Sequence, residues 1–403
     1  MTSPHTIRIE RFTHEHQLAP LRGQWNALAR GVAFRSYEWL ESWWRTYGVG
    51  PNRQLCVLGA VGGDGRLAGI APWYLEAAPL GGRTLRFLGS GEVCSDYMSV
   101  LCDVNQRDAI CTCIVDWLST DNQRSESART GWNRLELDGV DAADETMARI
   151  LDGMLAAGHL VSRRSRASCW RIHLPESWDA YLKQLSRSHR KQLRRLERHY
   201  FDSGRALLHL AANERELGQG LEALVRLHQR RRASLGERGA FASTRFIDFH
   251  AETAQRLLAT GNLRLVWLEL DGQIVAAEYQ VLGDGVVYAY QSGIEPTALQ
   301  HEPGRLITLA SLQLAIAEHR RAFDFLRGDE AYKAHWRAVP RPSEDVIIQR
   351  DTRGARLRHN LSAAGHNLKS LLRDGLNHSG EAARRRTDAS QPTAGGSLET
   401  KRT

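Results

Sequence analysis

The sequence predicts an α/β protein with mixed sheets, in which two similar units share a central cleft. The chain has 403 residues, which is too long for one average domain. Residues 263–291 form three apolar runs separated by two short glycine-containing turns, the pattern of an antiparallel meander. Strands, helices, meander, glycine-bearing loop, helix and strand follow one another in the same order in both halves, which indicates an architectural repeat.

The first unit is predicted at residues 1–165. Its strands are expected at 6–12, 54–62, 67–76, 84–88, 98–101, 134–137 and 160–163, and its helices at 18–29, 36–48, 106–118 and 144–157. In the helix at 36–48, Ser36 is the expected N-cap and Gly48 the stop. Its aromatic residues Trp39, Trp43 and Tyr47 are spaced by four, which predicts a buried stripe.

The second unit is predicted at residues 166–350. Its strands are expected at 169–174, 206–211, 263–270, 273–282, 286–291, 322–326 and 346–349, and its helices at 178–185, 187–200, 213–235, 246–258 and 304–318. A basic helix is predicted at 351–376, and the Ser, Gly, Thr and Arg content of 377–403 predicts a disordered tail.

A strand-to-helix corner closes the second unit. Asp324 lies between two aromatic residues of a short strand, and Gly328 then frees the backbone to turn. Asp329 is expected to cap a short helix that carries Tyr332 and Lys333. A purely structural corner would have the same pattern, but the repeat of the two units favours a functional site.

The charge balance is basic, with 54 Lys and Arg against 46 Asp and Glu and a net charge of +8. Much of the excess lies in residues 187–198, in 226–232 and in the C-terminal tail. Such a balance suits phosphate-bearing partners such as coenzymes, nucleotides, nucleic acid or anionic lipid, without selecting among them. For the amphipathic helix at 187–200 we favour a solvated face over a nucleic-acid or membrane patch.

The cysteines and the N-terminus predict a cytoplasmic protein. The six cysteines fall mostly within apolar runs and lack the spacing of a metal site, so we expect reduced core thiols and no bound metal. The N-terminus lacks the apolar core of a signal peptide, and no apolar run reaches the roughly 18 residues that span a bilayer. Membrane contact is therefore expected to be peripheral at most.

Several short segments carry a resemblance to a known family. They are residues 34–39 with Trp43 and Trp44, residues 95–97, Leu227 and His228 with Gly236, Gly239 and Phe241, residues 271–272 with Ala276 and Ala277, and residues 323–325 with Tyr332, Lys333 and Trp336. In this order the chain resembles the CelD/BcsL-like double-GNAT acetyltransferases, often linked to cellulose or exopolysaccharide biosynthesis. More distantly it resembles the Fem-type peptidyltransferases.

The resemblance implies acetyl-CoA as co-substrate, held between the fourth and fifth strands of the second unit. Strand four would be residues 286–292, strand five 322–326, and the pyrophosphate would meet a helix starting at Gly304. The cofactor-binding residues implied are Gln291, Ser292, Gly293, Gly304 and Arg305. The chain departs from the family in its phosphate loop, where residues 301–305 have one glycine and the carboxylate of Glu302. The first unit also lacks a phosphate loop, so we expect it to be a degenerate partner that forms one wall of the cleft.

Acyl transfer to an amine needs a proton acceptor and donors to the oxyanion. The catalytic candidates are Glu278, His228, Lys333 and Tyr290. Tyr290 is included because backbone N–H groups near it on the strand would donate to the oxyanion. Glu278 lies in an apolar strand and is either a base that lines the cleft or the partner of an arginine. His228 is either a packing residue or part of the cleft, and Lys333 is either solvated or functional. The substrate-binding candidates are Asp96, Tyr97, Arg232, Asp329 and Tyr332.

The expected acceptor is a small-molecule or sugar-linked amine, and DNA is not an expected partner. Two other functions stay open. A Fem-like transferase that uses aminoacyl-tRNA would explain the basic helices. A non-catalytic binding module of the same fold would explain the departure in the phosphate loop.

Overall fold

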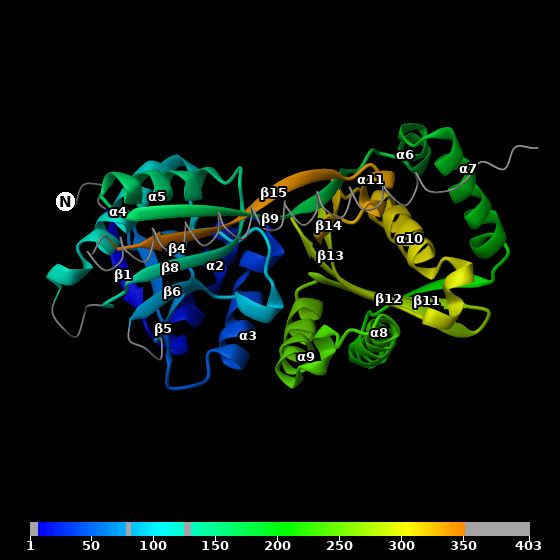
Figure 1. The fold of residues 1–403 in the computed structure, drawn as a ribbon, viewed down its shortest axis with the longest axis horizontal. Coiled ribbons are helices and arrows are strands. Elements are labelled where there is room, and N and C mark those ends of the chain that lie inside the picture. The colour runs from blue at the N-terminus through cyan, green and yellow to red at the C-terminus, as the bar shows by residue number, and fades with distance from the viewer. Residues whose placement is uncertain (1–6, 78–81, 125–129, 351–403) are drawn as a thin grey trace, which may run out of the picture. The chain divides into compact units, whose positions relative to one another are not determined.

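The computed structural model describes residues 7–77, 82–124 and 130–350 (Figure 1). The described residues up to Gln349 form one compact unit. The helix expected at 351–376 and the tail expected at 377–403 lie outside the described residues. Within the described part of the chain, none of the helices has both the length and the apolar content that a membrane span requires.

The first half of the compact unit contains most of the elements expected there. The helices are α1 (Glu15–Leu18), α2 (Arg22–Ala29), α3 (Tyr37–Tyr47), α4 (Arg107–Ser119) and α5 (Glu145–Ala156). The strands are β1 (Arg8–Phe12), β2 (Arg53–Leu55), β3 (Val57–Val61), β4 (Leu67–Ala71), β5 (Trp73–Ala77), β6 (Arg83–Phe87), β7 (Leu101–Cys102), β8 (Arg134–Asp141) and β9 (Leu160–His173). As predicted, Ser36 caps α3 by accepting a hydrogen bond from the Trp39 N–H, and Gly48 ends it. The strand expected at 98–101 is reduced to the two residues of β7.

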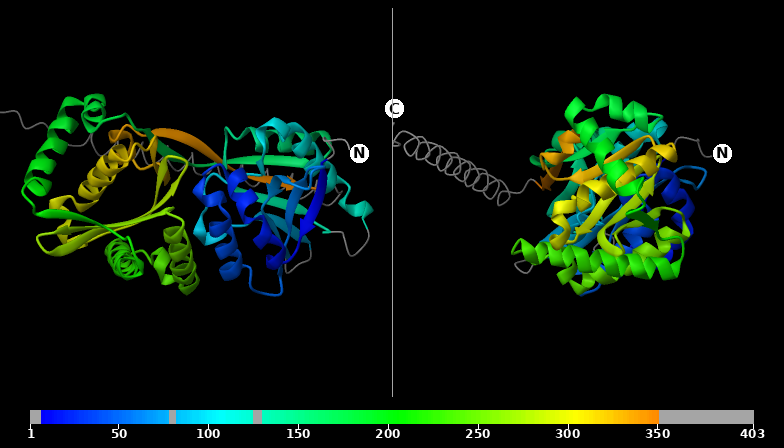
Figure 2. Two further views of the ribbon diagram at one scale, coloured as in Figure 1. Left: turned by 180° about the vertical axis from the view of Figure 1, so that it is seen from behind. Right: turned by 90° about the vertical axis from the view of Figure 1, so that its right-hand side faces the viewer.

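The second half contains the predicted meander and its flanking helices. The helices are α6 (Trp178–Gln184), α7 (Arg187–Leu196), α8 (Glu214–Ser234), α9 (Thr244–Ala259), α10 (Pro303–Ala317) and α11 (Tyr332–His335). The strands are β10 (Ala206–Leu210), β11 (Leu263–Leu270), β12 (Gln273–Gly283), β13 (Val286–Ile294), β14 (Ala322–Arg327) and β15 (Val339–Gln349). Helices α8 and α9 cover one face of the meander, and α6, α7 and α10 cover the other (Figures 1 and 2).

Two sheets organise the described residues. One has four strands in the order β1-β3-β4-β7, and the other has eleven in the order β10-β11-β12-β13-β14-β9-β15-β8-β6-β5-β2. The strands expected at 54–62 and 67–76 are therefore each split in two, because β3 and β4 belong to the small sheet while β2 and β5 belong to the large one. The second of these strands breaks at Pro72, which has no N–H to contribute to a strand ladder.

The strands β13 and β14 run parallel but pair at only three positions, from Val286 opposite Ala322 to Tyr288 opposite Asp324. Beyond Tyr288, β13 pairs only with β12, where the register shifts between Tyr279 and Gln280. Such a shift bends a strand and re-aims its side chains. The sheet consequently opens into a gap between the C-terminal ends of β13 and β14.

The corresponding gap of the first half lies between β6 and β8, which pair in parallel over three positions. Residues 89–99 fill this gap. The Met98 N–H donates to the Gly139 carbonyl at 3.0 Å. A Cβ on Gly139, whose φ is +70°, would lie 2.5 Å from the carbonyl oxygen of Ser95. The first half therefore leaves no space between these strands for a ligand.

The strands β9 and β15 run through both halves. The segments expected at 160–163 and 169–174 are one strand, and the strand expected at 346–349 begins at Val339. Residues 343–349 of β15 lie between β8 and β9, while residues 169–173 of β9 pair with β14. The expected unit boundary at 165/166 thus falls inside a strand. Local pattern did not reveal this, because residues 164–166 are polar and the pairing is long-range.

The carboxylate of Asp324 joins the halves. It is fully buried, and it accepts hydrogen bonds from the Tyr97 hydroxyl at 2.6 Å and from Arg171 Nε at 2.7 Å. Its second oxygen accepts from the N–H of Leu326 at 2.8 Å. Leu326 has a φ of +57°, a conformation that non-glycine residues seldom adopt. Asp324 therefore both neutralises Arg171 and fixes the turn at the end of β14.

We expect Asp324→Ala to lower the free energy of unfolding by about 3–5 kcal/mol, because the variant leaves Arg171 charged and unpaired in the core. Urea unfolding followed by tryptophan fluorescence measures this loss. Arg149→Ala is the control, since it removes an exposed ion pair with Asp108 and should cost about 0–1 kcal/mol. Equal losses in the two variants would show that the Asp324 network does not stabilise the fold.

Candidate active site

A cavity of ≈ 470 Å³ lies at the gap between β13 and β14. Its walls come from the C-terminal turns of α8, the N-terminal turns of α10, the ends of β13 and β14, and residues of α7 and α11. Seven of the predicted site residues line it: His228, Arg232, Glu278, Ser292, Gly304, Arg305 and Tyr332. These residues are far apart in the sequence, and the opening of the sheet brings them together.

Glu278 provides a carboxyl group at the inner end of this cavity. Its side chain is buried, and one oxygen accepts hydrogen bonds from Gln280 Nε2 and from the Ser311 hydroxyl at 3.3 Å. Burial raises the pKa of Glu278, while these two hydrogen bonds act in the opposite direction. Glu278 thus lines the cavity, as one of the two hypotheses for this residue predicts. Such a group can accept a proton near neutral pH.

Two histidines line the cavity as neutral rings. His228 is buried, its ring lies edge-on to Phe241 with centroids 5.0 Å apart, and its Nδ1 is 3.1 Å from Gln229 Oε1. His189 lies against Trp336 with ring centroids 5.3 Å apart. Burial lowers the pKa of both rings, which keeps them uncharged at neutral pH. Uncharged imidazoles can relay a proton between a substrate and water.

The N-terminus of α10 forms the outer, basic end of the cavity. Glu302 precedes the helix, and its carboxylate is paired with Arg305 and lies 3.8 Å from Arg195. A Cβ on Gly304 would meet only Ile294, at 3.8 Å, so the backbone there is open to the cavity. Arg231 also lines the cavity and pairs with no carboxylate among the described residues. Helix dipole and guanidinium groups together favour an anion at this end.

Lys333, Asp329 and Tyr290 lie away from the cavity. The buried Lys333 ammonium donates to the carbonyls of residues 326, 327 and 328 at 2.9–3.1 Å, so it holds the end of β14. Asp329 does not cap α11, which begins after Ala331 without a side-chain cap; it accepts instead from the Ser168 N–H and Trp170 Nε1. The Tyr290 hydroxyl donates to the Val93 carbonyl at 2.6 Å.

Gln291 and Gly293, the other two cofactor-binding candidates on β13, do not line the cavity as Ser292 does. Gln291 is half-buried. Gly293 is packed under α8, where a Cβ would lie 2.4 Å from the backbone nitrogen of His228. Gly293 therefore allows α8 to approach β13 closely enough to present His228 to the cavity.

Asp96 and Tyr97 do not line the cavity; they contact Arg327 and Asp324 of the second half in a buried network. Asp96 is buried, and its carboxylate lies 2.9 Å from Arg327 Nη2. Burial, followed by the negative charge of Asp324, raises the pKa of Asp96 to about 7. The Tyr97 ring lies under the guanidinium of Arg171, 5.1 Å from its centroid. These contacts hold the two halves together.

Sequence reasoning missed His189, Arg231 and Ser311. His189 lies on the predicted amphipathic helix, and nothing in its neighbouring residues marks it as part of a cavity. Ser311 lies inside an apolar helix, where a single hydroxyl is a weak signal. It lies about two turns beyond Gly304, and only the packing of α10 against β12 places its hydroxyl beside Glu278.

The second half matches a known sequence family. Residues 187–334 match the family described as "Acetyltransferase (GNAT) domain". This segment contains α7–α10, the meander and the opening between β13 and β14. No curated protein matches the sequence.

Solved structures extend the likeness to both halves. The crystal structure of FemX has a TM-score of 0.59 and 11% identity, and the match covers 86% of this chain and 98% of that one. A conserved protein of unknown function from Bacteroides thetaiotaomicron has a TM-score of 0.53 and 13% identity, covering 86% and 100%. The C-terminal domain of a putative lysylphosphatidylglycerol synthetase from Agrobacterium fabrum has a TM-score of 0.50 and 10% identity, covering 86% and 96%.

The chain therefore has the predicted tandem GNAT fold, of the kind also found in FemX. At these identities the solved structures establish the fold alone.

The raised pKa of Asp96 predicts how the stability of the protein depends on pH. The folded protein binds this proton more tightly than the unfolded chain, in which the pKa is about 3.9. Ionising Asp96 therefore destabilises the folded protein. The loss of stability grows as pH rises from about 4 to about 7 and stays constant above that range. Asp96→Asn removes this cost.

We expect the free energy of unfolding of Asp96→Asn, relative to that of the unmodified protein, to rise by up to about 4 kcal/mol between about pH 4 and pH 8. Urea unfolding at several pH values measures the difference, with the exposed substitution Asp108→Asn as control. A constant difference across this range would show that Asp96 does not titrate as proposed.

Proposed function

We propose that the protein is an acyl-CoA-dependent N-acyltransferase, with acetyl as the acyl group, whose active site is the cavity between β13 and β14. The buried carboxyl of Glu278 at the inner end of that cavity is the observation that carries the proposal. Its raised pKa suits a general base at neutral pH. The GNAT family match of residues 187–334 supports the same reaction class.

The cavity residues fit an acyl-CoA donor, which supplies an acyl carbon activated as a thioester. The open backbone at Gly304 and the guanidinium groups of Arg231 and Arg305 would hold a pyrophosphate. Glu302 stands where the family has a glycine-rich loop. Its pairing with Arg305 and Arg195 offsets the negative charge that would repel a phosphate. The gap beside β13 and β14 would accept the extended pantetheine arm.

In this proposal the acceptor amine attacks the thioester carbonyl carbon, a C–N bond forms and the C–S bond breaks. Backbone N–H groups of β13 on the side that no longer pairs with β14 stabilise the oxyanion. The amine proton passes to Glu278 directly or through water, and the thiolate leaves with the CoA. Gln280 and Ser311 fix the position of the carboxyl.

For the acceptor we propose a small-molecule or sugar-linked amine. The residues around Trp39, Asp96, His228 and Asp324 resemble those of the CelD/BcsL-like proteins, which favours a role in exopolysaccharide biosynthesis. The half-exposed Tyr332 and the exposed Arg232 lie at the mouth of the cavity, where an acceptor would enter.

Glu278→Gln should lower kcat for acyl transfer by about 10² to 10⁴, because the amide cannot accept the amine proton. Release of CoA thiol from acetyl-CoA, with glucosamine and other amines as acceptors, measures the rate. Ser311→Ala is the matched variant, which removes one hydrogen bond to the carboxylate and leaves the base in place. We expect it to reduce the rate far less and to raise the pH of half-maximal activity.

The proposal fails if Glu278→Gln retains full activity with an unchanged melting temperature. In the unmodified protein, kcat/KM should rise with pH around a pKa above the ordinary value of about 4.3 for a glutamate. That limb of the pH profile should be absent in Glu278→Gln.

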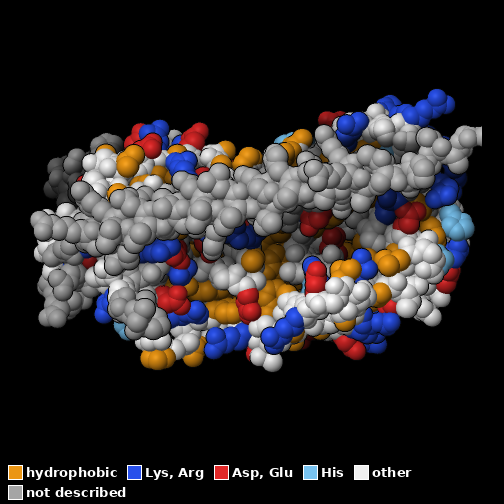
Figure 3. Space-filling model, in the orientation of Figure 1, with side chains coloured by type: hydrophobic (Ala, Val, Ile, Leu, Met, Phe, Trp, Pro, Cys, Tyr) orange, Lys and Arg blue, Asp and Glu red, His pale blue; other side chains and the backbone are white. Residues whose placement is uncertain are grey.

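Transfer from aminoacyl-tRNA is the second candidate, favoured by the likeness to FemX and by helix α7. The exposed residues of α7 and the following turn include Arg187, Lys191, Arg194, Arg195 and Arg198. Lys and Arg side chains gather where α7 lies, at the outer edge of the second half (Figure 3). A binding module without catalysis is the remaining alternative.

Calorimetric titration separates these functions. We expect acetyl-CoA to bind with a Kd that rises about tenfold in Arg231→Gln, through loss of a charge-assisted contact to phosphate. Arg226→Gln, an exposed change on the same helix outside the cavity, is the control. No binding of acetyl-CoA, together with transfer activity that ribonuclease abolishes, would establish the tRNA-dependent function instead.

A further inference from the structure

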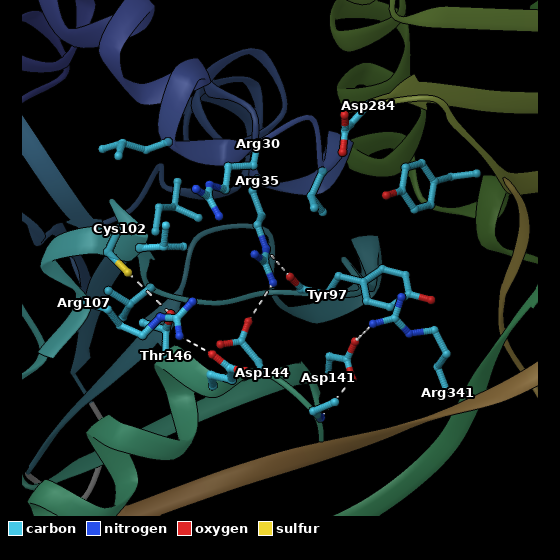
Figure 4. A pocket seen from close by; sticks show the side chains of 18 of the residues that line it. Arg30, Arg35, Tyr97, Cys102, Arg107, Asp141, Asp144, Thr146, Asp284 and Arg341 are labelled. Atoms are coloured by element: carbon cyan, nitrogen blue, oxygen red, sulfur yellow. Dashed lines mark hydrogen bonds and ion pairs between the residues drawn. The ribbon is translucent and has the colours of Figure 1, made fainter. Parts of the chain in front are cut away.

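A second cavity, of ≈ 380 Å³, is lined by residues of both halves, most of them from the first, and shares no lining residue with the candidate active site. It lies at the C-terminal turn of α2, the N-terminal ends of α4 and α5, and the end of β8 (Figure 4). In the sequence, α4 lies between the parallel strands β6 and β8, as α10 lies between the parallel strands β13 and β14. The cavity at the start of α4 therefore resembles the candidate active site in its position within the repeat.

A coenzyme cannot occupy the first cavity as it would the second. Residues 89–99 fill the gap between β6 and β8, as the hydrogen bond from Met98 to Gly139 shows. No slot is left for a pantetheine arm. What remains in the first half is the part of the cavity around the start of α4, where Arg107 lines the wall.

Arginine–carboxylate pairs form part of the wall. Arg35 is 3.0 Å from Asp144, Arg341 is paired with Asp141, and Arg107 is paired with Glu145. Figure 4 shows Arg30 and Arg35 on one side of the cavity and Asp141 and Asp144 on the other. The cavity thus presents fixed donors and fixed acceptors to the same small volume.

Arg30 differs from the other arginines of this cavity. It is exposed at the rim and has no carboxylate partner among the described residues. Its guanidinium can bind an anion without breaking an ion pair within the protein. A phosphate matches the geometry of a guanidinium better than a single carboxylate oxygen does.

We propose that this cavity binds a small sugar phosphate, a phosphomonoester that also carries hydroxyl groups. Arg30 binds the phosphate, and the carboxylates of Asp141 and Asp144 accept hydrogen bonds from the hydroxyls. The volume is in the range of small-molecule sites. The first half is then a ligand-binding partner of the catalytic half.

Calorimetric titration of the whole protein with glucose 6-phosphate, inorganic phosphate and glucose tests the proposal. We expect glucose 6-phosphate to bind more tightly than either fragment, because only it engages both sides of the cavity. Arg30→Gln should weaken its binding about tenfold, the effect of one charge-assisted contact. Arg8→Gln, an exposed change on β1 outside the cavity, should leave the Kd unchanged.

Two results would overturn the proposal: no binding of glucose 6-phosphate, or binding that Arg30→Gln leaves unchanged. Equal affinity for glucose 6-phosphate and inorganic phosphate would exclude a sugar subsite. Asp144→Asn tests the hydroxyl contacts separately, since asparagine can still cap α5 but no longer neutralises Arg35 and offers one acceptor fewer to a hydroxyl. It should weaken binding of glucose 6-phosphate relative to that of inorganic phosphate. No acyl donor is present in these titrations, so their outcome is independent of the proposed transferase activity.

Discussion

The buried carboxylate of Asp324 is the constraint on which both halves depend. It neutralises Arg171 of β9 and accepts a hydrogen bond from the Tyr97 hydroxyl of the first half. It also accepts a hydrogen bond from the N–H of Leu326 and so stabilises the positive φ of that residue. Because this turn ends the pairing of β14, the opening beside β13 follows from it. Lys333 completes the turn by binding three successive carbonyls. A single charged group thus joins the interface between the halves to the geometry of the candidate active site.

The two faces of β12 have different environments, and this difference produces the chemistry of the site. Tyr279 points toward α8 and α9 and packs among aromatic rings, 5.2 Å from the ring centroid of His250. Glu278 and Gln280 point toward α10, where Ser311 binds both. An isolated carboxyl on this face would be strongly destabilising. The polar trio reduces that cost while burial keeps the carboxyl basic.

Local signals in the sequence predicted most helices, the meander and the tandem arrangement. Ser36 and Gly48 set the limits of α3 because caps act over a few residues, and Glu278 was recognisable as a charge within an apolar strand. The positions of Lys333 and Asp329 were not predictable from their neighbours alone. Each binds backbone or side-chain groups across a turn or on another strand, and those partners are determined by the pairing of β14 with β9. The sugar-phosphate cavity was missed for the same reason, since its walls come from both halves.

The strands β9 and β15 pair with strands of both halves, and this arrangement has a consequence for synthesis on the ribosome. The strand that fits between β8 and β9 is also the last strand of the described chain, residues 339–349. Until it emerges, β8 and the first part of β9 each expose an unpaired edge, and such edges favour aggregation. The nascent first half is therefore incomplete even after all its own residues have been made. Its maturation waits for the end of the second half, which supplies the strand that pairs with both edges.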